Sequence, residues 1–417
     1  MTTSYASSAD LIESRYAWTR LWVSLALMTI GGVGMYSITV VLPSIQAEFG
    51  VARAAASLPY TWTMLGFGIG GIVMGRLADK YGVMVPLLIG AVGLGLGYLG
   101  AGMASSLAFF MLMQGLLMGF LGTSATFAPL VADTSQWFTR RRGMALAICM
   151  SGNYLAGAVW PPIIAYFAGQ YGWRSTYMGI GLFCVLTIIP LALVLRPRPP
   201  VQNNTAAGQS RFAMPSERPL GLSAGMAQFL LCVAGVSCCV AMSMPQVHIV
   251  AYCGDLGFGA ARGAEMLSLM LAMGVISRLV SGWISDQIGG LKTLLLGSVL
   301  QGVALLLFLP FEGLVPLYVV SGLFVLFQGG IVPSYALIVR EYFVPKEAGA
   351  RVGTVLMATL FGMALGGWMS GAIFDWTGSY KAAFVNGIAF NLLNLGIVLY
   401  LLWRLRRMRH AQTSANT

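Results

Sequence analysis

About twelve long apolar stretches follow one another along this chain of 417 residues, and they restrict what it can fold into. A helix of about 20 apolar residues crosses the hydrocarbon core of a bilayer, which is roughly 30 Å thick. Charged residues make up 9% of the sequence, against about 25% in soluble domains. We therefore predict an all-α polytopic membrane protein. The apolar stretches lie near residues 20–43, 57–76, 84–104, 107–131, 143–166, 174–195, 221–249, 262–285, 292–311, 314–338, 352–374 and 380–403.

Basic residues are unevenly distributed over the loops between these stretches. If the N-terminus is cytoplasmic, nineteen of the 24 Lys and Arg residues fall in cytoplasmic segments and four in outside loops. The positive-inside rule predicts this bias for a chain with both termini in the cytoplasm. A basic face beside anionic lipid also explains the net charge of +11, so we expect no nucleic acid partner. We expect an integral protein of the bacterial cytoplasmic (inner) membrane, whose first stretch is an uncleaved anchor.

The longest polar interruption, residues 196–219, separates two parts of nearly equal length. We expect it to be a cytoplasmic linker between an N-terminal six-helix half, 1–195, and a C-terminal six-helix half, 220–417. The halves match in sequence: "GRLADKYG" at 75–82 has the Gly, Asp and Gly spacing of "GWISDQIG" at 282–289, 207 positions later. Matches at corresponding places indicate a duplicated unit. Two shorter matches are "EFG" at 48–50 with "DLG" at 255–257, and "WF" at 137–138 with "YF" at 342–343.

Two parallel six-helix repeats are the plan of the major facilitator superfamily of secondary transporters. The paired motif resembles that superfamily's loop between helices 2 and 3, and between helices 8 and 9. The resemblance covers essentially the whole chain and implies transport by alternating access. It also implies a gating motif, in which glycines let helices approach closely and an aspartate at a helix end binds basic groups. The motif residues are Gly75, Asp79, Gly82, Gly282, Asp286 and Gly289.

Arg278 lies inside the stretch "LMLAMGVISRLVSGWISD", eight residues before Asp286. At the rise of a helix this places it about 12 Å from the helix end, near the middle of the membrane. Its helical face carries small and polar residues such as Gly274, Ser277 and Ser281, so we expect it to face the bundle interior. All thirteen acidic residues fall in loops or near helix ends. We therefore expect Arg278 to bind an anionic substrate; the alternative is a guanidinium satisfied by backbone carbonyls and water.

Three further segments resemble one branch of the superfamily, the monocarboxylate porters with their bacterial oxalate and formate exchanging relatives. They are "GVGMYSITVVLPSIQAEFGV" at 32–51, "WFTRRRGMALAICMSGNYLAG" at 137–157 and "MPQVHIVAYCGDLGF" at 244–258. Arg278 falls where this branch has its helix 8 arginine. The resemblance implies a small organic anion as substrate.

The chain also departs from this branch at three places. Animal members typically have an aspartate four residues before the arginine and a lysine in helix 1, whereas this sequence has Gly274 and no lysine in its first stretch. The oxalate-type relatives have a second cation in helix 11, whereas residues 353–371 contain none. One cation suits one carboxylate, so we expect a monocarboxylate rather than a dicarboxylate.

Proton coupling would need a titratable group, and two residues are candidates. His248 is the first, because its unperturbed pKa near 6.5 lets modest shifts change its charge, and Asp255 is the second. We expect both near the outer mouth and expect the transporter to be proton-coupled. Exchange of one anion for another needs no such group and stays open.

Further pocket residues are expected from the symmetry of the halves. Pro129 and Pro333 interrupt corresponding stretches, a pattern that points to a binding site at the membrane midplane. Polar and aromatic side chains near these breaks and in helices 1, 2 and 11 are the candidates. They are Tyr36, Tyr60 or Trp62, Thr123, Thr126, Gln328, Ser334, Tyr335 and Thr359.

Two other classes of protein fit the sequence less well. A membrane enzyme would need a metal or an acid-base cluster, but the sequence has no HExxH motif and only two histidines, so we expect no enzyme, no metal and no cofactor. A proton-driven exporter of the same fold would need a buried carboxylate for a cationic substrate, and it remains an alternative beside anion exchange.

The six cysteines lie in apolar surroundings without metal-ligand spacing. The expected partners are a small organic anion, protons and the lipid bilayer, with the protein as a monomer.

Overall fold

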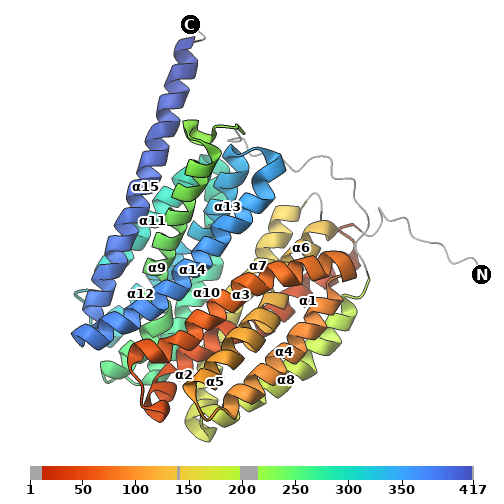
Figure 1. Cartoon of the computed structure of the whole chain (residues 1–417), viewed down its shortest axis with the longest axis vertical. Coiled ribbons are helices and arrows are strands. Elements are labelled where there is room, and N and C mark those ends of the chain that lie inside the picture. The colour runs from red at the N-terminus through yellow and green to blue at the C-terminus, as the bar shows by residue number, and fades with distance from the viewer. Residues whose placement is uncertain (1–11, 139–140, 198–214, 416–417) are drawn as a thin grey trace, which may run out of the picture.

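The computed structural model describes residues 12–138, 141–197 and 215–415, and these are helical almost throughout (Figure 1). Within these ranges, eleven helical stretches are long and apolar enough to cross a membrane. A twelfth helix of 29 residues, α3 (Arg53–Tyr81), packs among them; glycines and the polar residues at both of its ends make it less apolar. The prediction of an all-α membrane protein is thus confirmed.

The helices of the described chain fall into two groups. The first contains α1 (Arg15–Gly31), α2 (Val33–Phe49), α3, α4 (Met84–Gly102), α5 (Leu107–Leu112), the π-helical η1 (Met113–Thr123), α6 (Ala128–Trp137), α7 (Arg142–Tyr171) and α8 (Trp173–Val194). The second contains η2 (Pro219–Gly221), α9 (Ala224–Asp255), α10 (Ala260–Ile288), α11 (Gly290–Leu307), α12 (Leu314–Gln328), α13 (Ile331–Tyr342), α14 (Pro345–Thr377) and α15 (Tyr380–Ala415). Most of the expected linker, residues 198–214, lies outside the described residues.

The two copies of the loop motif have the same backbone conformation. Gly82 ends α3 with φ 87° and ψ 163°, and Gly289 ends α10 with φ 82° and ψ 164°. Residues with a side chain rarely adopt such positive φ values, so the glycine at each position is required by the turn. The match of residues 137–138 with 342–343 also has the same backbone conformation in both halves. α6 ends at Trp137 and α13 at Tyr342, and each helix is followed by a phenylalanine with extended backbone. The backbone therefore supports a duplicated unit.

The spans that contain Pro129 and Pro333 are broken at corresponding places. The fourth span breaks between η1 and α6, and Pro129 lies in the first turn of α6. The tenth span breaks at Gly329 and Gly330, and Pro333 lies in the first turn of α13. Proline fits the first turn of a helix because the amide groups there have no partner within the helix.

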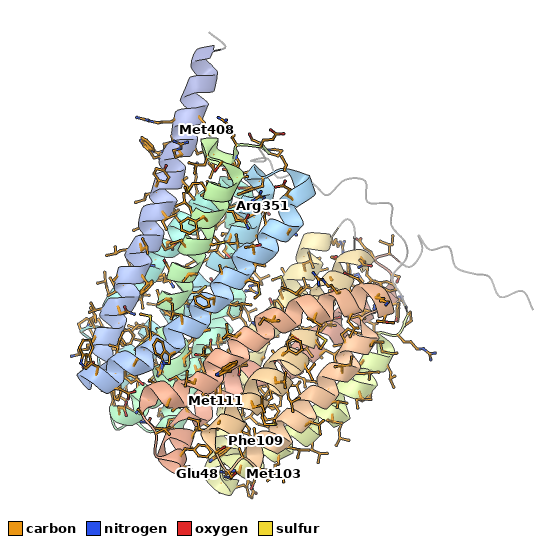
Figure 2. The ribbon with its side chains drawn as sticks, viewed as in Figure 1. Glu48, Met103, Phe109, Met111, Arg351 and Met408 are labelled. Atoms are coloured by element: carbon orange, nitrogen blue, oxygen red, sulfur yellow. The ribbon has the colours of Figure 1, made fainter. Side chains whose placement is uncertain are left out.

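The two groups meet at one end of the molecule and diverge toward the other (Figure 1). We call the first the paired end; it carries the turns at residues 50–53, 255–260 and 377–380. We call the other the linker end, where α8 ends and α9 begins. Figure 2 shows Glu48 at the paired end and Arg351 toward the linker end. Large apolar side chains such as Trp62 and Leu186 remain exposed, as expected of surfaces that face lipid.

Close contacts across the two groups run along two helix pairs. A Cβ built on Gly371 of α14 would lie 2.9 Å from Cα of Ala54 in α3, so only glycine permits this approach. Farther along, Gly68 of α3 faces Met357 of α14. In the second pair, the Ser268 hydroxyl of α10 donates to the Ala158 carbonyl of α7. Pairs α3 with α14 and α7 with α10 therefore join the halves.

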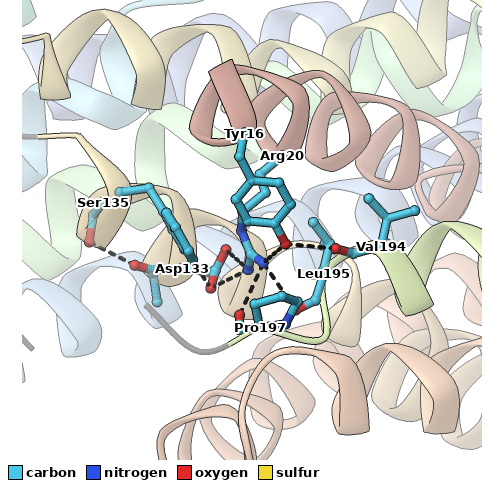
Figure 3. A network of polar contacts seen from close by, with 9 residues as sticks. Tyr16, Arg20, Asp133, Ser135, Val194, Leu195 and Pro197 are labelled. Carbon is cyan, nitrogen blue, oxygen red and sulfur yellow. Dashed lines mark hydrogen bonds and ion pairs between the residues drawn. The ribbon is translucent and has the colours of Figure 1, made fainter. Parts of the chain in front are cut away.

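A buried ion pair fixes the linker end of the first half (Figure 3). Nη2 of Arg20 in α1 lies 2.9 and 2.8 Å from the two carboxylate oxygens of Asp133 in α6. Nη1 donates to the Tyr16 hydroxyl and to the carbonyls of Leu195 and Pro197, just beyond α8. The guanidinium therefore connects α1 and α6 to the chain entering the linker.

We expect Arg20→Ala to lower the free energy of unfolding by about 3–5 kcal/mol, because it leaves the Asp133 carboxylate buried and unpaired. Thermal unfolding in detergent measures this loss. Arg15→Ala is the matched control, since Arg15 lies on the same helix and is exposed. Equal unfolding temperatures for the two variants would contradict the structural role of the pair.

Candidate functional site

Arg278 is half-buried on α10, where it faces α7 of the other half. Its Nη1 donates to the Met150 carbonyl at 3.2 Å, and its Cζ lies 4.5 Å from the centre of the Tyr154 ring. It makes no ion pair within 4.0 Å with any carboxylate of the described ranges. Its Nε is buried and has no hydrogen-bond partner in the described part of the chain. One edge of the guanidinium, formed by Nε and Nη2, is therefore free.

Tyr36, a predicted site residue, lies near this arginine, and Tyr60, another, lies near Tyr36. A Cβ built on Gly157 of α7 would lie 2.9 Å from Cζ of Tyr36, which places the Tyr36 ring against α7. Tyr36 is within electrostatic reach of Arg278 and Tyr154, and Tyr60 is within reach of Tyr36. Residues of α2, α3, α7 and α10 are thus brought together. Trp62 is 51% exposed on the outer surface instead.

Tyr154, whose ring lies under the guanidinium of Arg278, was not among the predicted site residues. The available signal was its place in "SGNYLAG" at 151–157, where it is an aromatic ring among small residues. Such a ring on a small-residue face can reach a neighbouring helix that also has small residues there. Its partner helix has Gly274 at that level.

Thr359 is buried on α14 of the second half. Its hydroxyl donates to the Leu356 carbonyl of its own helix at 2.7 Å. A Cβ built on Gly235 of α9 would lie 3.0 Å from its methyl group, so Thr359 packs between α14 and α9. Tyr60 and Thr359 both lie within reach of Cys239, so the two side chains approach the same part of α9.

The structure does not bring the other predicted pocket residues to Arg278. The Tyr335 hydroxyl donates to Oδ1 of Asn394 at 2.9 Å, and Oε1 of Gln328 accepts from Nε2 of Gln301 at 2.8 Å. These contacts lie between α11, α12, α13 and α15, inside the second half. In the first half, Thr126 donates to the Thr123 carbonyl. Thr126 and Thr123 face Gly31 and Gly34, and Ser334 donates to the Gly330 carbonyl.

His248 and Asp255 belong to one hydrogen-bonded network at the paired end. The Arg53 guanidinium of α3 donates to both oxygens of Asp255 at 3.1 Å and to the Tyr380 hydroxyl at 2.8 Å. The Tyr380 hydroxyl lies 3.0 Å from Nδ1 of His248, whose Nε2 lies 2.8 Å from the Gly367 carbonyl. This network, from Asp255 through Arg53 and Tyr380 to His248 and Gly367, is the paired-end network. It joins α3 of the first half to α9, α14 and α15 of the second.

The order of donors in this network accommodates a neutral histidine. Tyr380 accepts from Arg53, so its own proton is free to be donated to Nδ1 of His248. In that arrangement Nε2 carries the proton that is donated to the Gly367 carbonyl. His248 is completely buried. Gly367 also packs against the ring of Tyr60, so the paired-end network extends to a predicted site residue.

Asp375 of α14 adds a further contact between the two halves at the paired end. Asp375 accepts the backbone N–H groups of Arg53 and Ala54 at 2.8 and 2.7 Å. These groups begin α3, where amide groups have no partner within the helix and the helix dipole favours negative charge. Arg53, Tyr380 and Asp375 were absent from the predicted site, because nothing in their local sequence shows that three distant segments meet.

The gating motif lies at the linker end. Asp79 and Asp286 are exposed near the ends of α3 and α10. A Cβ built on Gly75 or Gly282 would meet nothing within 4 Å, so neither glycine is at a helix contact in this conformation. This agrees with the divergence of the two halves at that end (Figure 1). In the described ranges, no group of three or more His, Cys, Asp or Glu residues could hold a metal ion.

The sequence matches the family described as Major Facilitator Superfamily over residues 24–327 and 230–417. The chain is similar to Monocarboxylate transporter 13 of Bos taurus, with 28% identity over 80% of this chain and 76% of that protein. It is also similar to Monocarboxylate transporter 11 of Homo sapiens, with 28% identity over 78% and 69%. The MFS-type transporter pynF of Aspergillus niger is 25% identical over 73% and 69%. The resemblance to the monocarboxylate branch is confirmed, and all these relatives are transporters rather than enzymes.

Solved structures support the same fold. A peptide transporter, POT, in complex with sulfate has a TM-score of 0.73 at 13% identity and covers 96% of this chain and 97% of that one. A bacterial homolog of the human lysosomal transporter Spinster, described as inward-facing and occupied, has a TM-score of 0.66 at 14% identity, covering 94% and 97%. At these identities the likeness concerns the fold alone.

We expect Arg53→Ala to loosen the paired end, because it removes the contacts to Asp255 and Tyr380 together. A single cysteine at buried Ser57, in a variant without the six native cysteines, reports this opening. Its alkylation by a water-soluble maleimide should be several-fold faster in Arg53→Ala. Arg262→Ala is the control, since Arg262 pairs with Glu265 of its own helix. Unchanged labelling in Arg53→Ala would show that the network does not hold this end closed.

Proposed function

The chain belongs to the Major Facilitator Superfamily, and on that premise we propose that it transports a small monocarboxylate across the membrane by alternating access. The observation that carries this proposal is the free edge of Arg278. A guanidinium at this depth without a carboxylate costs several kcal/mol or more. A carboxylate that bonds Nε and Nη2 together would satisfy that edge in the planar geometry arginine favours.

A single free cation sets the charge of the substrate. Arg278 stands alone among the described residues around Tyr36, Tyr154 and Tyr60, whose side chains carry no formal charge. One guanidinium balances one carboxylate, and a second carboxylate would remain unpaired in a low dielectric. The monocarboxylate names of two relatives agree with this reading.

Two tyrosine side chains are suited to contact the organic part of such an anion. Tyr36 lies near the arginine, Tyr60 lies near Tyr36 and against Gly367, and Thr359 lies on α14 of the second half. We propose these three as contacts for the substrate. Tyr335, Gln328 and Thr126 are bonded within their own halves, so we propose that they act by keeping each half rigid while the halves rotate.

The direction of opening follows from the proposed orientation. If the linker end is cytoplasmic, as the basic loops predict, this conformation is closed to the outside and diverges toward the cytoplasm. The paired-end network must then break to admit an anion from outside. The gating motif would close the linker end in the opposite state, when Gly75 and Gly282 reach their contacts.

We propose His248 as the proton carrier of this cycle. A proton on Nδ1 would remove the acceptor for Tyr380 and place a second positive charge near Arg53. Protonation therefore opposes the closed paired end and favours its opening. Asp255 takes part through its ion pair with Arg53. Gly367 contacts both His248 and the Tyr60 ring. Opening of the paired end would therefore also act on Tyr60, a proposed contact for the substrate.

Anion exchange is the second candidate function. The observation that favours it is Gly274, which leaves Arg278 without a neighbouring carboxylate that could titrate. An exchanger would need an anion on the opposite side for each turnover and no proton gradient. Uptake into proteoliposomes with and without an internal anion separates the two modes.

We expect Arg278→Ala to reduce uptake of labelled lactate or pyruvate by about 100-fold, because two charge-assisted hydrogen bonds are lost. Arg278→Lys should also fail, since a point charge cannot bond both carboxylate oxygens in the plane. Arg340→Ala, at an exposed arginine of α13, is the control. Normal uptake by correctly folded Arg278→Ala would refute the proposed site.

We expect His248→Gln to lose the stimulation of uptake by an inward proton gradient while it retains exchange of labelled for unlabelled anion. Glutamine can accept from Tyr380 and donate to Gly367, but it cannot take up a proton. His410→Gln is the control at the other histidine of the sequence. Full gradient stimulation in His248→Gln would assign proton coupling to another group or favour exchange.

A further inference from the structure

We propose that Tyr154 is the positioning residue that presents the free edge of Arg278 to a carboxylate, and that Gly274 exists to admit its ring. This rests on the proposed function and deepens it by naming what orients the binding group. Tyr154 lies on α7 of the first half, and Arg278 and Gly274 lie on α10 of the second. The orientation of the guanidinium is thus set across the interface of the two halves.

Two contacts from α7 reach the guanidinium from different directions. Cζ of Arg278 lies over the Tyr154 ring, 4.5 Å from the ring centre. The Met150 carbonyl, one helical turn earlier on α7, accepts from Nη1 at 3.2 Å. The ring contact and the hydrogen bond restrain the guanidinium at two of its parts. Together they leave the edge of Nε and Nη2 as the part that can bind a ligand.

The Nε atoms of Arg20, Arg53 and Arg278 are all buried without a hydrogen bond among the described side chains. Arg20 and Arg53 pair with carboxylates through their terminal nitrogens, whereas Arg278 pairs with none in the described ranges. Buried donors of this kind are usually satisfied. A carboxylate that bonds Nε and Nη2 of Arg278 would satisfy this donor.

Gly274 and Tyr154 form a matched pair. A Cβ built on Gly274 would lie 2.7 Å from Cδ1 and 2.8 Å from Cε1 of the Tyr154 ring, closer than real Cβ contacts occur. Any side chain at 274 would therefore push the ring off the guanidinium. Gly274 lies one helical turn before Arg278 on the same face, where an acidic side chain would have paired with the arginine. The uncharged ring instead leaves the positive charge available to the substrate.

The test compares three substitutions in proteoliposomes, with labelled lactate, pyruvate and benzoate as probes. Tyr154→Leu removes the ring face and should raise KM about 10-fold, with the maximal rate changed far less. Tyr154→Phe keeps the face and should stay within about 2-fold of the unaltered protein. Tyr166→Leu, at a tyrosine of the same helix that is 64% exposed, is the matched control and should change nothing.

A double variant separates positioning from general packing. Gly274→Ala should raise KM as Tyr154→Leu does, and the combined variant should be no worse than Tyr154→Leu alone, because both act through one ring. Additive losses would overturn the pairing. A KM for Tyr154→Leu equal to that of the unaltered protein, or a Tyr154→Phe as impaired as Tyr154→Leu, would overturn the positioning role.

The proposed function fails in a distinguishable way. If Arg278→Ala abolishes uptake while Tyr154→Leu leaves KM unchanged, the anion site stands and the role of Tyr154 is wrong. If Arg278→Ala leaves uptake intact, or if the unaltered protein takes up none of the three probes, both proposals are overturned together.

Discussion

Hydrocarbon offers a polar group no hydrogen-bond partner, and the rest of this structure depends on that constraint. Backbone amides are satisfied within helices, so the described chain is helical almost throughout. Buried polar side chains follow the same rule. Asn391 donates to Gln301, and Asn394 donates to Ser298, between helices of the second half. In the first half, Gln114 donates to Tyr177. Each half is therefore a polar-bonded unit that can move as a whole.

Bonds within a half and bonds between halves have different consequences. The buried pair of Arg20 and Asp133 lies within the first half and persists in any rotation that leaves the half intact. The paired-end network crosses from one half to the other, so under the proposed mechanism it has to form and break in each cycle. Arg53 is buried there, but the Asp255 side chain is 36% exposed, which lowers the cost of separating the two charges. Polar contacts between halves are suited to a gate because water can replace them.

Arg278 belongs to one half and makes its contacts with the other. It belongs to the second half, yet Tyr154 and Met150 of the first half orient it. Its free edge is thus shaped where the two halves meet. An anion bound there would contact both, which is what coupling of binding to movement requires. The paired-end network reaches the same region through Gly367 and the Tyr60 ring.

The sequence alone was sufficient for the class of fold, the repeated unit and the unusual arginine, because hydropathy, motif spacing and charge are properties of position along the chain. It also proposed Tyr36 and Tyr60 as substrate contacts, and in the structure Tyr36 lies near Arg278. It placed Tyr335, Gln328 and Thr126 in the same pocket, whereas the tertiary structure directs them into their own halves. Helices that are apolar on all sides carry little periodicity to fix their rotation. The ring over Arg278 and the partners of His248 were therefore decided only by how distant helices pack.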